Sequence, residues 1–476
     1  MKRRMLSVKK GFGICVTLAL ALFPAVSTAA NSVQRYWTGT TASGAIVTDE
    51  ECPLVVEKEI LTFEVPEFPE QYYQEIDDYL AYDGSVTAQY TFRNPSENTV
   101  TATLVFPFGT VPNYGYLQDR ETGEVFLNAD TEKYGITVDG GETEKILRHT
   151  LSLYGEQFEL ERDMGLLHEG YVKDTFYSPD LPVTRYTYEP EEVDTETYTA
   201  ASAAFVLSAD PEKTKVLMEN QSGGTLQKDS VRLESWVEQD RPFVVNVIGE
   251  PLEQMPDWKF YENGACEKEI EGTMVLAGTE TTTLKELLLS EYQTESGVLE
   301  YDWYNAAVAM LNLSEWEYGA VSGTEFTFDL SERLMRWYEY EITVPPGETI
   351  VNTVTAPLYP SIDTGYRPPV YEYRYLTSPA KTWAEFGTLE IVIHTPYYRI
   401  KSEPEGFEKT ADGYVCHLKG LPEDELTFWL CGEEEPESPY YSSDAFPAGA
   451  AAAGLAAVLI LAVVLAAVIR KRKKRK

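Results

Sequence analysis

An apolar stretch close to the C-terminus constrains this chain more than any other feature. Residues 445–469 contain no charged side chain, and they are followed at once by Arg470, Lys471, Arg472, Lys473, Lys474, Arg475 and Lys476. As a helix rising about 1.5 Å per residue, the stretch is roughly 37 Å long, enough to cross a hydrocarbon core of about 30 Å. Cations beside a span stay on the cytoplasmic side. We therefore expect one C-terminal transmembrane helix, with the seven cations as its stop-transfer signal.

The N-terminus agrees with this topology. Five cations among the first ten residues precede an apolar stretch at 14–26 and small residues at 27–30, which is the pattern of a secretory signal peptide. The mature chain is then expected to begin near Asn31. If the segment is not cleaved, both ends are cytoplasmic and the middle is still outside. Either way, we expect a single-pass protein of the cell membrane with an extracytoplasmic body.

Charge excludes one class of partner. The formal net charge is −38. After the five cations of the signal and the seven of the tail are set apart, residues 31–444 contain 27 basic and 77 acidic side chains, a formal charge of −50. Such a surface repels phosphate backbones, so we expect no nucleic-acid partner. The 32 Tyr, 19 Phe and 8 Trp argue against disorder, because disordered segments are poor in aromatics.

Alternation of apolar and polar residues predicts a mainly β fold. Two strands at 86–92 and 100–106 are expected to form a hairpin, and Asp139-Gly140-Gly141 is suited to the turn of another hairpin at 134–149. The turn at 345–348 is expected to join strands at 338–344 and 349–356. Further candidate strands lie at 184–188, 215–219, 231–237, 243–248, 371–375, 389–393, 414–418 and 426–430.

A short helical pair interrupts the strands. Leucines at helical spacing follow Thr283, and Glu286 stands three residues after it, which is the pattern of a capping box. A second helix is expected over 298–313, with Trp303, Met310 and other apolar residues near one face.

These patterns define the expected fold class: mainly β, with antiparallel β-sandwich-like modules, an inserted helical pair and one C-terminal transmembrane helix. The expected segments are a signal peptide at 1–30, a β-rich domain at 31–250, a helix-containing segment at 251–324, a β-sandwich-like module at 325–431, an acidic stalk at 432–444, the transmembrane helix at 445–469 and a basic cytoplasmic tail at 470–476.

Cysteine usage allows disulfides. Four cysteines remain once Cys15 is removed with the signal, and an even count outside the cytoplasm permits three pairings. Cys416 and Cys431 flank a turn-like stretch, so they are expected to face each other across a hairpin; buried thiols are the alternative.

Aromatic and acidic residues give the candidate binding sites. Tyr371, Tyr373 and Tyr375 alternate along one strand, and Trp383 follows, so these four residues form a candidate face on which a sugar or peptide stacks. Filling the core is the alternative and the favoured interpretation. Acidic clusters at 119–124 and 189–196 contain the oxygen ligands that calcium prefers, although neither has the spacing of a known calcium loop. We expect no other cofactor and no catalytic or metal-ligating residue.

Three segments together resemble a known family. They are VTAQYTFRNPSENTVTATLVFPFG at 86–109, YEITVPPGETIVNTVTAPLY at 340–359 and YRYLTSPAKTWAEFGTLEIVI at 373–393. In this order they resemble the anchor segments of an uncharacterised family of bacterial secreted domains. The resemblance implies β-rich extracytoplasmic modules. It implies no activity.

The function expected from these features is that of a non-enzymatic binding or structural module of the cell envelope, whose partner is a glycan, a peptide or a protein. One alternative is a membrane-anchored cell-wall or glycan hydrolase, since paired carboxylates perform glycoside hydrolysis. Another is an extracytoplasmic sensor, which would act through a partner because the predicted tail has only seven residues.

Overall fold

The computed structural model describes residues 36–37, 41–43, 45–47, 52–69, 82–107, 116–118, 125–127, 134–152, 160–238, 241–292, 294, 297–323 and 330–437. The predicted signal peptide, transmembrane helix and stop-transfer cations lie outside these ranges. Within them, no helix combines the length and the apolar character that crossing a membrane requires. The predicted span at 445–469 therefore stays a prediction.

The chain forms two compact units. The larger comprises Thr38–Ser361 and Tyr371–Glu435. In the smaller unit, strand β1 (Tyr36–Trp37) pairs antiparallel with β24 (Ser361–Asp363). The backbones of Arg367 and Glu437 exchange two hydrogen bonds of 2.8 and 2.9 Å. The beginning of the predicted stalk is thus bound to the segment 362–370.

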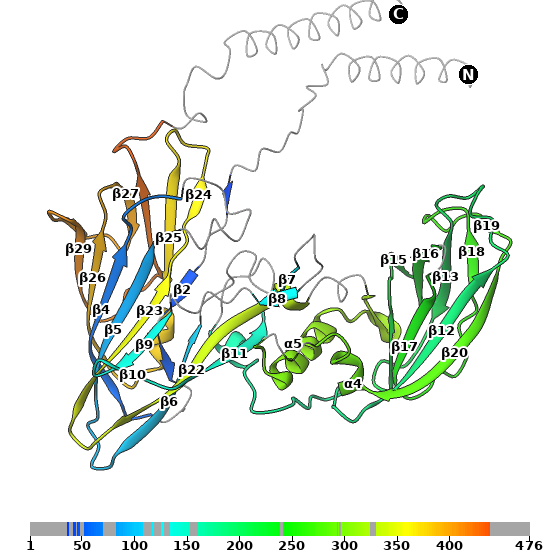
Figure 1. Ribbon diagram of the computed structural model, residues 1–476, viewed down its shortest axis with the longest axis horizontal. Coiled ribbons are helices and arrows are strands. Elements are labelled where there is room, and N and C mark those ends of the chain that lie inside the picture. Colours follow the sequence, from blue (N-terminus) through cyan, green and yellow to red (C-terminus); the bar gives the residue numbers. More distant parts are fainter. Residues whose placement is uncertain are drawn as a thin grey trace, which may run out of the picture. The chain divides into compact units, whose positions relative to one another are not determined.

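The larger unit contains a β-sandwich built from strands that are far apart in the sequence, seen as the blue, cyan, yellow and orange strands of Figure 1. One layer has, in order, β10 (Gly141–Glu142), β9 (Gly135–Val138), β23 (Thr349–Pro357), β5 (Ser85–Arg93), β4 (Val55–Glu64), β26 (Phe386–His394), β29 (Gly413–Lys419) and β28 (Glu408–Lys409). The other layer consists of β11 (Lys145–Leu151), β22 (Leu334–Val344), β6 (Val100–Pro107) and β3 (Ile46–Val47) in one sheet, and β2 (Thr41–Ser43), β25 (Val370–Leu376), β30 (Leu426–Cys431) and β27 (Tyr398–Glu403) in another.

Strand alternation explains this core. Val86, Ala88, Tyr90 and Phe92 of β5 are all buried and belong to one cluster with residues of both layers, such as Leu104. Because successive side chains of a strand point to opposite faces, one face of each strand is buried between the layers. The predicted mainly β, sandwich-like fold is confirmed.

Three of the predicted strand pairs cross between layers instead of forming hairpins. β5 pairs with β4 and β23, whereas the next strand β6 pairs with β22 and β3. The turns β22–β23 and β29–β30 also change sheets. Buried Asn94 supports the first of these crossings: its Nδ2 donates to Val344 O at 2.8 Å, and its carbonyl accepts from Gly347 N at 2.9 Å. Two crossing turns thus lie against each other.

Of the hairpin expected around Asp139-Gly140-Gly141, the part next to the turn is formed. β9 and β10 pair there, and Asp139 and Gly140 have φ angles of 48° and 79°. Positive φ at both central residues is typical of a two-residue hairpin turn. Not every pairing is antiparallel: β26 runs parallel to β4 over 386–394 and 56–64. Since these strands are remote in sequence, no short turn forces them to run antiparallel.

A second sandwich is inserted between β11 and β22, two paired strands of the first one. One of its sheets has β20 (Thr273–Thr283), β12 (Pro182–Glu191), β17 (Phe243–Gly249), β14 (Thr214–Met218) and β21 (Ala320–Val321). The other has β15 (Gly223–Leu226), β16 (Val231–Trp236), β13 (Ser202–Leu207), β18 (Lys259–Tyr261) and β19 (Glu269–Ile270). The expected segments 31–250 and 325–431 therefore contribute strands to the same sheets, and part of 31–250 lies in the insertion.

The strands β14 and β17 of the first sheet of the insertion are buried on both faces. Val216 and Val247 pack toward the second sheet, while their neighbours Leu217 and Ile248 pack toward the helices. The helices are α4 (Leu284–Leu288) and α5 (Glu300–Leu313), which confirm the predicted helical pair. The capping box is also present: Thr283 Oγ1 accepts from the amide of Glu286 at 3.2 Å, and Glu286 Oε2 accepts from the amide of Thr283 at 3.0 Å.

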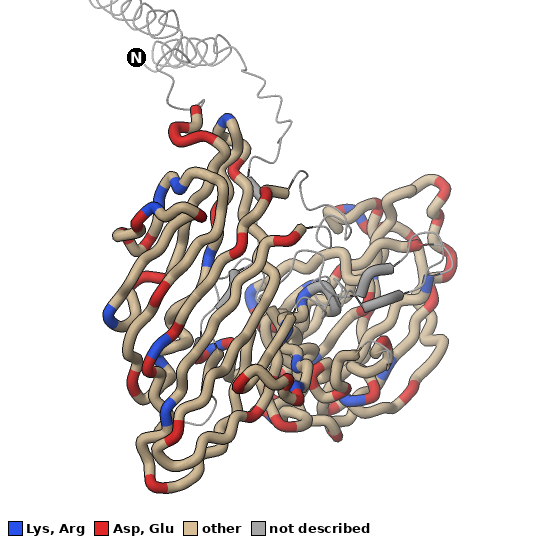
Figure 2. The backbone as a smooth tube through the Cα atoms, turned by 60° about the vertical axis from the view of Figure 1, so that its left-hand side comes forward, with Lys and Arg blue, Asp and Glu red and all other residues tan. Residues whose placement is uncertain are grey.

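Shorter elements complete the described chain. They are the two-stranded sheet of β7 (Tyr116–Gln118) and β8 (Val125–Leu127), helix α3 (Leu160–Met164), and the 3-10 turns at Glu317–Gly319, Leu330–Arg333 and Ser378–Thr382. Acidic residues occur along strands and in turns of both sandwiches (Figure 2).

Candidate binding site

A pocket opens at one end of the inserted sandwich, where β14 and β16 end and β17 begins. Its volume is about 180 Å³. It is lined by Glu219, Asn220, Gln221, Ser222, Ser235, Trp236, Glu238, Arg241, Pro242 and Phe243. The lining thus combines carboxylates, amides, a guanidinium group and aromatic rings in a space smaller than the roughly 300–1,000 Å³ of sites that enclose drug-sized ligands.

The carboxylate of Glu219 is held in place from below the pocket. Arg185 donates to its two oxygens at 2.7 and 3.1 Å, and Asn246 Nδ2 donates at 2.9 Å. Arg185 and Asn246 are direct partners on the paired strands β12 and β17. A two-pronged arginine contact fixes both the position and the orientation of a carboxylate.

A second set of bonds orders Asn220, Glu238 and Arg241, which also line the pocket. Arg241 Nη1 donates to Glu238 Oε2 at 3.1 Å, and Arg241 Nη2 donates to Asn220 Oδ1. Asn220 has a φ angle of 58°, and its carbonyl accepts from Ser235 Oγ at 2.5 Å. Asparagine tolerates this left-handed conformation better than most residues. The turn after β14 therefore presents the Asn220 side chain in a fixed place.

Trp236 is the exposed aromatic residue of this site, since Phe243 is buried. It lies on β16, two and four residues after Glu234 and Arg232, so the three side chains point to the same face of the sheet. Arg232 donates to Glu234 at 2.9 and 3.0 Å on this face. Trp236 therefore belongs to the outer, polar face. It keeps 45% of its surface exposed. A Cβ atom on Gly264 would lie only 2.6 Å from Trp236 Cη2. The indole ring thus rests directly on glycine backbone, and any side chain at 264 would displace it.

Both carboxylates of the pocket have cationic partners. Glycoside hydrolysis requires one carboxyl group that carries a proton and a second one beside it. Glu219 and Glu238 both accept hydrogen bonds from arginine, so each carboxyl group is engaged with a guanidinium group. An exposed aromatic ring beside fixed donors and acceptors is the usual lining of a site that recognises a small polar ligand.

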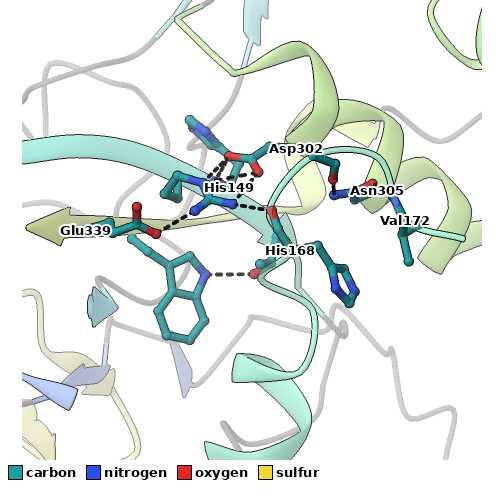
Figure 3. A network of polar contacts seen from close by, with 10 residues as sticks. His149, His168, Val172, Asp302, Asn305 and Glu339 are labelled. Carbon is teal, nitrogen blue, oxygen red and sulfur yellow. Dashed lines mark hydrogen bonds and ion pairs between the residues drawn. The ribbon is translucent and has the colours of Figure 1, made fainter. Parts of the chain in front are cut away.

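A buried charge network lies elsewhere in the larger unit (Figure 3). Arg148 of β11, 3% exposed, donates to Asp302 of α5 at 3.2 Å, to Glu339 of β22 at 2.5 Å and to the carbonyl of His168 at 2.7 Å. The amide of His149 also donates to Asp302, at 2.9 Å. These contacts fasten the helix of the insertion to the two strands between which the insertion leaves and returns.

Burial perturbs the groups of this network. It raises the pKa of Asp302, against the opposing effect of Arg148. Burial by itself lowers the pKa of Arg148, but hydrogen bonds and charges from Asp302 and Glu339 raise it above its ordinary value. The pKa of His149 is lowered to about 3, first by burial and then by the charges of Arg336 and Arg148. One arginine between two acids, deep in the structure, is a structural connection and offers no exposed reactive group.

The predicted aromatic binding face is wrong, because its residues fill the core of the first sandwich. Tyr373, Tyr375 and Trp383 are 0%, 1% and 5% exposed, and Tyr371 is partly buried with its ring stacked on Phe68 at a centroid distance of 3.9 Å. Their polar atoms have partners inside: Trp383 Nε1 donates to the carbonyl of Ala45 at 3.3 Å. Alternating tyrosines here serve packing, which was the favoured interpretation.

Tyr375 leads to a feature that the sequence did not indicate. Its hydroxyl donates to Glu59 Oε1 at 3.3 Å, and it lies 3.4 Å from the hydroxyl of Tyr90. Glu59, on β4, is 2% exposed within the aromatic core. Desolvation raises the pKa of Glu59 to about 7, although hydrogen bonds from Tyr90 and Tyr375 lower it in part.

The predicted disulfide between Cys416 and Cys431 is not formed. Cys416 carries a free thiol, whose sulfur lies 3.9 Å from the carbonyl oxygen of Glu405. The physical reason is the crossing turn: Cys416 lies on β29 in one layer and Cys431 on β30 in the other, so the two strands do not face each other as a hairpin.

Metal ligands are not gathered in the part of the chain that the structure describes. No group of three or more His, Cys, Asp or Glu side chains is placed to hold an ion there. This finding covers the acidic cluster at 189–196, whereas the cluster at 119–124 lies outside the described residues.

The pocket was missed by the sequence analysis, although one signal for it exists. The strand at 231–237 was predicted, and its alternation places Trp236 with Arg232 and Glu234 on the polar face. A tryptophan at a polar-face position is a candidate contact residue. The other lining residues come from two turns, one after β14 and one before β17, and from the ends of β16 and β17, and nothing in their spacing brings them together.

Comparisons with known proteins add little. No family model matches the chain, and no curated protein does. A solved structure of a proposed nutrient binding protein from Legionella pneumophila has a TM-score of 0.32 and 10% sequence identity, and the similarity covers 83% of this chain and 72% of that chain. A similarity of this size carries no argument about fold or ligand, so a function has to be inferred from the pocket itself.

Proposed function

We propose that this protein is a non-enzymatic binding protein of the cell envelope, anchored by its C-terminal helix, and that the pocket at Trp236 receives the ligand. The single observation that carries the proposal is this pocket, which joins an exposed indole ring to carboxylate, amide and guanidinium groups already fixed by the fold. Groups that are ordered before binding lose little freedom when the ligand arrives, which favours affinity. In this proposal the first sandwich is the frame, and the stop-transfer cations keep the body outside the cell.

A membrane-anchored hydrolase is the second candidate, because two carboxylates, Glu219 and Glu238, line the same pocket. Their arginine partners argue against it. A guanidinium group beside a carboxyl group favours its charged form, whereas a general acid has to carry a proton. A sensor that acts through a partner would use the same binding step and would differ only in passing the signal to that partner.

One experiment separates binding from hydrolysis. The purified full-length protein, in a zwitterionic detergent, is mixed with soluble fragments of bacterial cell wall, and tryptophan fluorescence and new reducing ends are both followed. We expect a saturable fluorescence change in the wild type, its loss in Trp236→Ala, and a constant number of reducing ends. Accumulating reducing ends would make the protein a hydrolase, and the absence of any fluorescence change would overturn the proposed function.

A further inference from the structure

We infer that the pocket binds a single ring of a neutral saccharide, stacked on Trp236 and bonded through its hydroxyl groups to the polar lining. This inference names the ligand class of the proposed function and rests on it. Four features of the described residues support it: the size of the pocket, the mixture of donors and acceptors, the charge, and the position of the indole ring.

Size limits the ligand first. A volume of about 180 Å³ is well below the roughly 300–1,000 Å³ of pockets that enclose a drug-sized molecule. It suits one six-membered ring or one side chain. The remainder of a longer ligand, such as an oligosaccharide, would therefore lie outside the pocket.

The lining suits a group that both donates and accepts hydrogen bonds. A carboxylate has about four acceptor positions, and the bonds recorded from Arg185 and Asn246 occupy three on Glu219. A guanidinium group has five donors, and the bonds recorded to Glu238 and Asn220 occupy two on Arg241. The lining thus offers both an acceptor and donors. A hydroxyl group, being both donor and acceptor, can satisfy each of them.

The charge of the lining narrows the class of ligand that the pocket can bind. Glu219 and Glu238 stand in the lining against one cation, Arg241, and the body of the protein is strongly acidic. Phosphorylated or carboxylated ligands are repelled by such a surface. A cationic ligand would meet Arg241, which already occupies the position beside Glu238 at 3.1 Å. A neutral polar ligand avoids both conflicts.

The indole ring supplies the apolar half of the site. A sugar ring has C–H groups on its faces and hydroxyl groups around its edge, so it binds where a flat aromatic surface adjoins polar groups. Trp236 has this position: it is 45% exposed, it lines the pocket, and its ring is supported by the backbone of Gly264.

The test uses the full-length protein in a zwitterionic detergent, because alkyl-glycoside detergents are themselves sugars. Glucose, galactose, N-acetylglucosamine and their β-linked disaccharides are titrated by calorimetry and by tryptophan fluorescence, beside putrescine and glycylglycine as cationic and zwitterionic probes. We expect saturable binding of at least one saccharide, a loss of about tenfold or more in affinity in Trp236→Ala, and a smaller loss in Trp236→Tyr, which keeps a stacking ring.

Two further variants sharpen this result. Gly264→Ala is expected to weaken binding although residue 264 itself does not line the pocket, because a Cβ there displaces the indole ring. Tyr398→Ala removes another exposed aromatic side chain, 39% exposed in the first sandwich, and is expected to leave the affinity unchanged. Equal melting temperatures would show that all variants are folded.

The outcomes distinguish this inference from the proposed function. Binding of only putrescine or glycylglycine that is lost in Trp236→Ala keeps the binding function and overturns the saccharide class. Saccharide binding that Trp236→Ala leaves intact overturns the assignment to this pocket. A response to cell-wall fragments without any response to the saccharides overturns the inference alone, whereas silence toward every probe and the fragments overturns both.

Discussion

Replacing the buried carboxyl group in the core of the first sandwich should stabilise the protein in a pH-dependent way. Glu59 is 2% exposed and has a pKa raised from 4.5 to about 7, mainly by desolvation. The folded protein therefore holds a proton that the unfolded chain releases. Since the pKa is higher in the folded state, the contribution of Glu59 to the free energy of unfolding is fully present below pH 4.5. It is lost as the pH rises through about 7.

The size of this effect comes from the shift. Each pKa unit corresponds to about 1.4 kcal/mol, so raising the pKa from 4.5 to about 7 costs about 3 kcal/mol of unfolding free energy at pH 8. Glu59→Gln keeps the shape and an oxygen acceptor for Tyr375 but cannot ionise. We expect the variant to be more stable than the wild type by about 3 kcal/mol at pH 8, and nearly equal to it at pH 4.

Urea unfolding of wild type and variant at pH 4, 5, 6, 7 and 8 measures this difference directly, with the slope of each transition checked for constancy. Glu341→Gln is the matched control, because Glu341 occupies an exposed position on β22. Its difference from the wild type should vary little with pH. A Glu59→Gln difference that stays constant across this range would refute the reasoning, because an unperturbed carboxyl group would titrate equally in both states.

Three further predictions concern other parts of the structure. His149 has a pKa lowered to about 3 by burial, so its contribution to stability is present above pH 6.5 and is lost as the pH falls. The wild type should therefore lose free energy of unfolding between pH 7 and pH 4.5, and His149→Gln should make this loss smaller by about 2 to 3 kcal/mol, measured by urea unfolding. Asp302→Asn leaves Arg148 with a weakened partner in a buried network and should cost about 3 to 5 kcal/mol, whereas pairing Asp302→Leu with Arg148→Met should cost less than that. A single variant no less stable than the pair would contradict this. Thr283→Ala removes the capping bond of α4 and should cost about 1 kcal/mol, while Thr282→Ala, which keeps that bond, should cost less.

Glu59 and His149 have opposite effects between about pH 4.5 and 6.5. The folded state holds the proton of Glu59 more tightly than the unfolded chain does, and it binds a proton at His149 less readily. Their contributions to the pH dependence of stability therefore oppose each other in this window. The wild type alone would conceal both shifts, so each variant has to be compared with it separately.

The sequence predicted where strands lie but not which strands are neighbours. The strands at 86–92 and 100–106 exist as β5 and β6, and the helical pair with its capping box at Thr283 is present. Period-two alternation reports that one face is buried, and a strand that pairs with its neighbour buries a face in the same way as a strand that crosses to the opposite layer. For this reason three turns were misassigned as hairpins, and with them the bridge between Cys416 and Cys431.

Alternation also explains why the candidate aromatic face lies in the core. Tyr373 and Tyr375 alternate with charged residues, so parity alone puts them on the buried face, where the structure has them. Trp236, in contrast, lies on the same face of its strand as Arg232 and Glu234. The informative aromatic residue was therefore the one that shares a face with charges.

The sequence could not show which residue packs against Trp236, or that the other lining residues lie close to it. Gly264 is 28 positions away from Trp236 in the chain, and only the fold shows that its missing side chain makes room for the indole ring. Asn220 and Arg241 reach the pocket because the turn after β14 and the start of β17 meet at one end of a sandwich. All the groups that would contact a ligand therefore come from the inserted module, while Glu59 and Arg148 lie outside the pocket. Substituting those two residues changes stability at positions that do not touch the ligand, so the affinity of the folded protein should be preserved, and a parallel loss of affinity would show that the pocket is not an independent site.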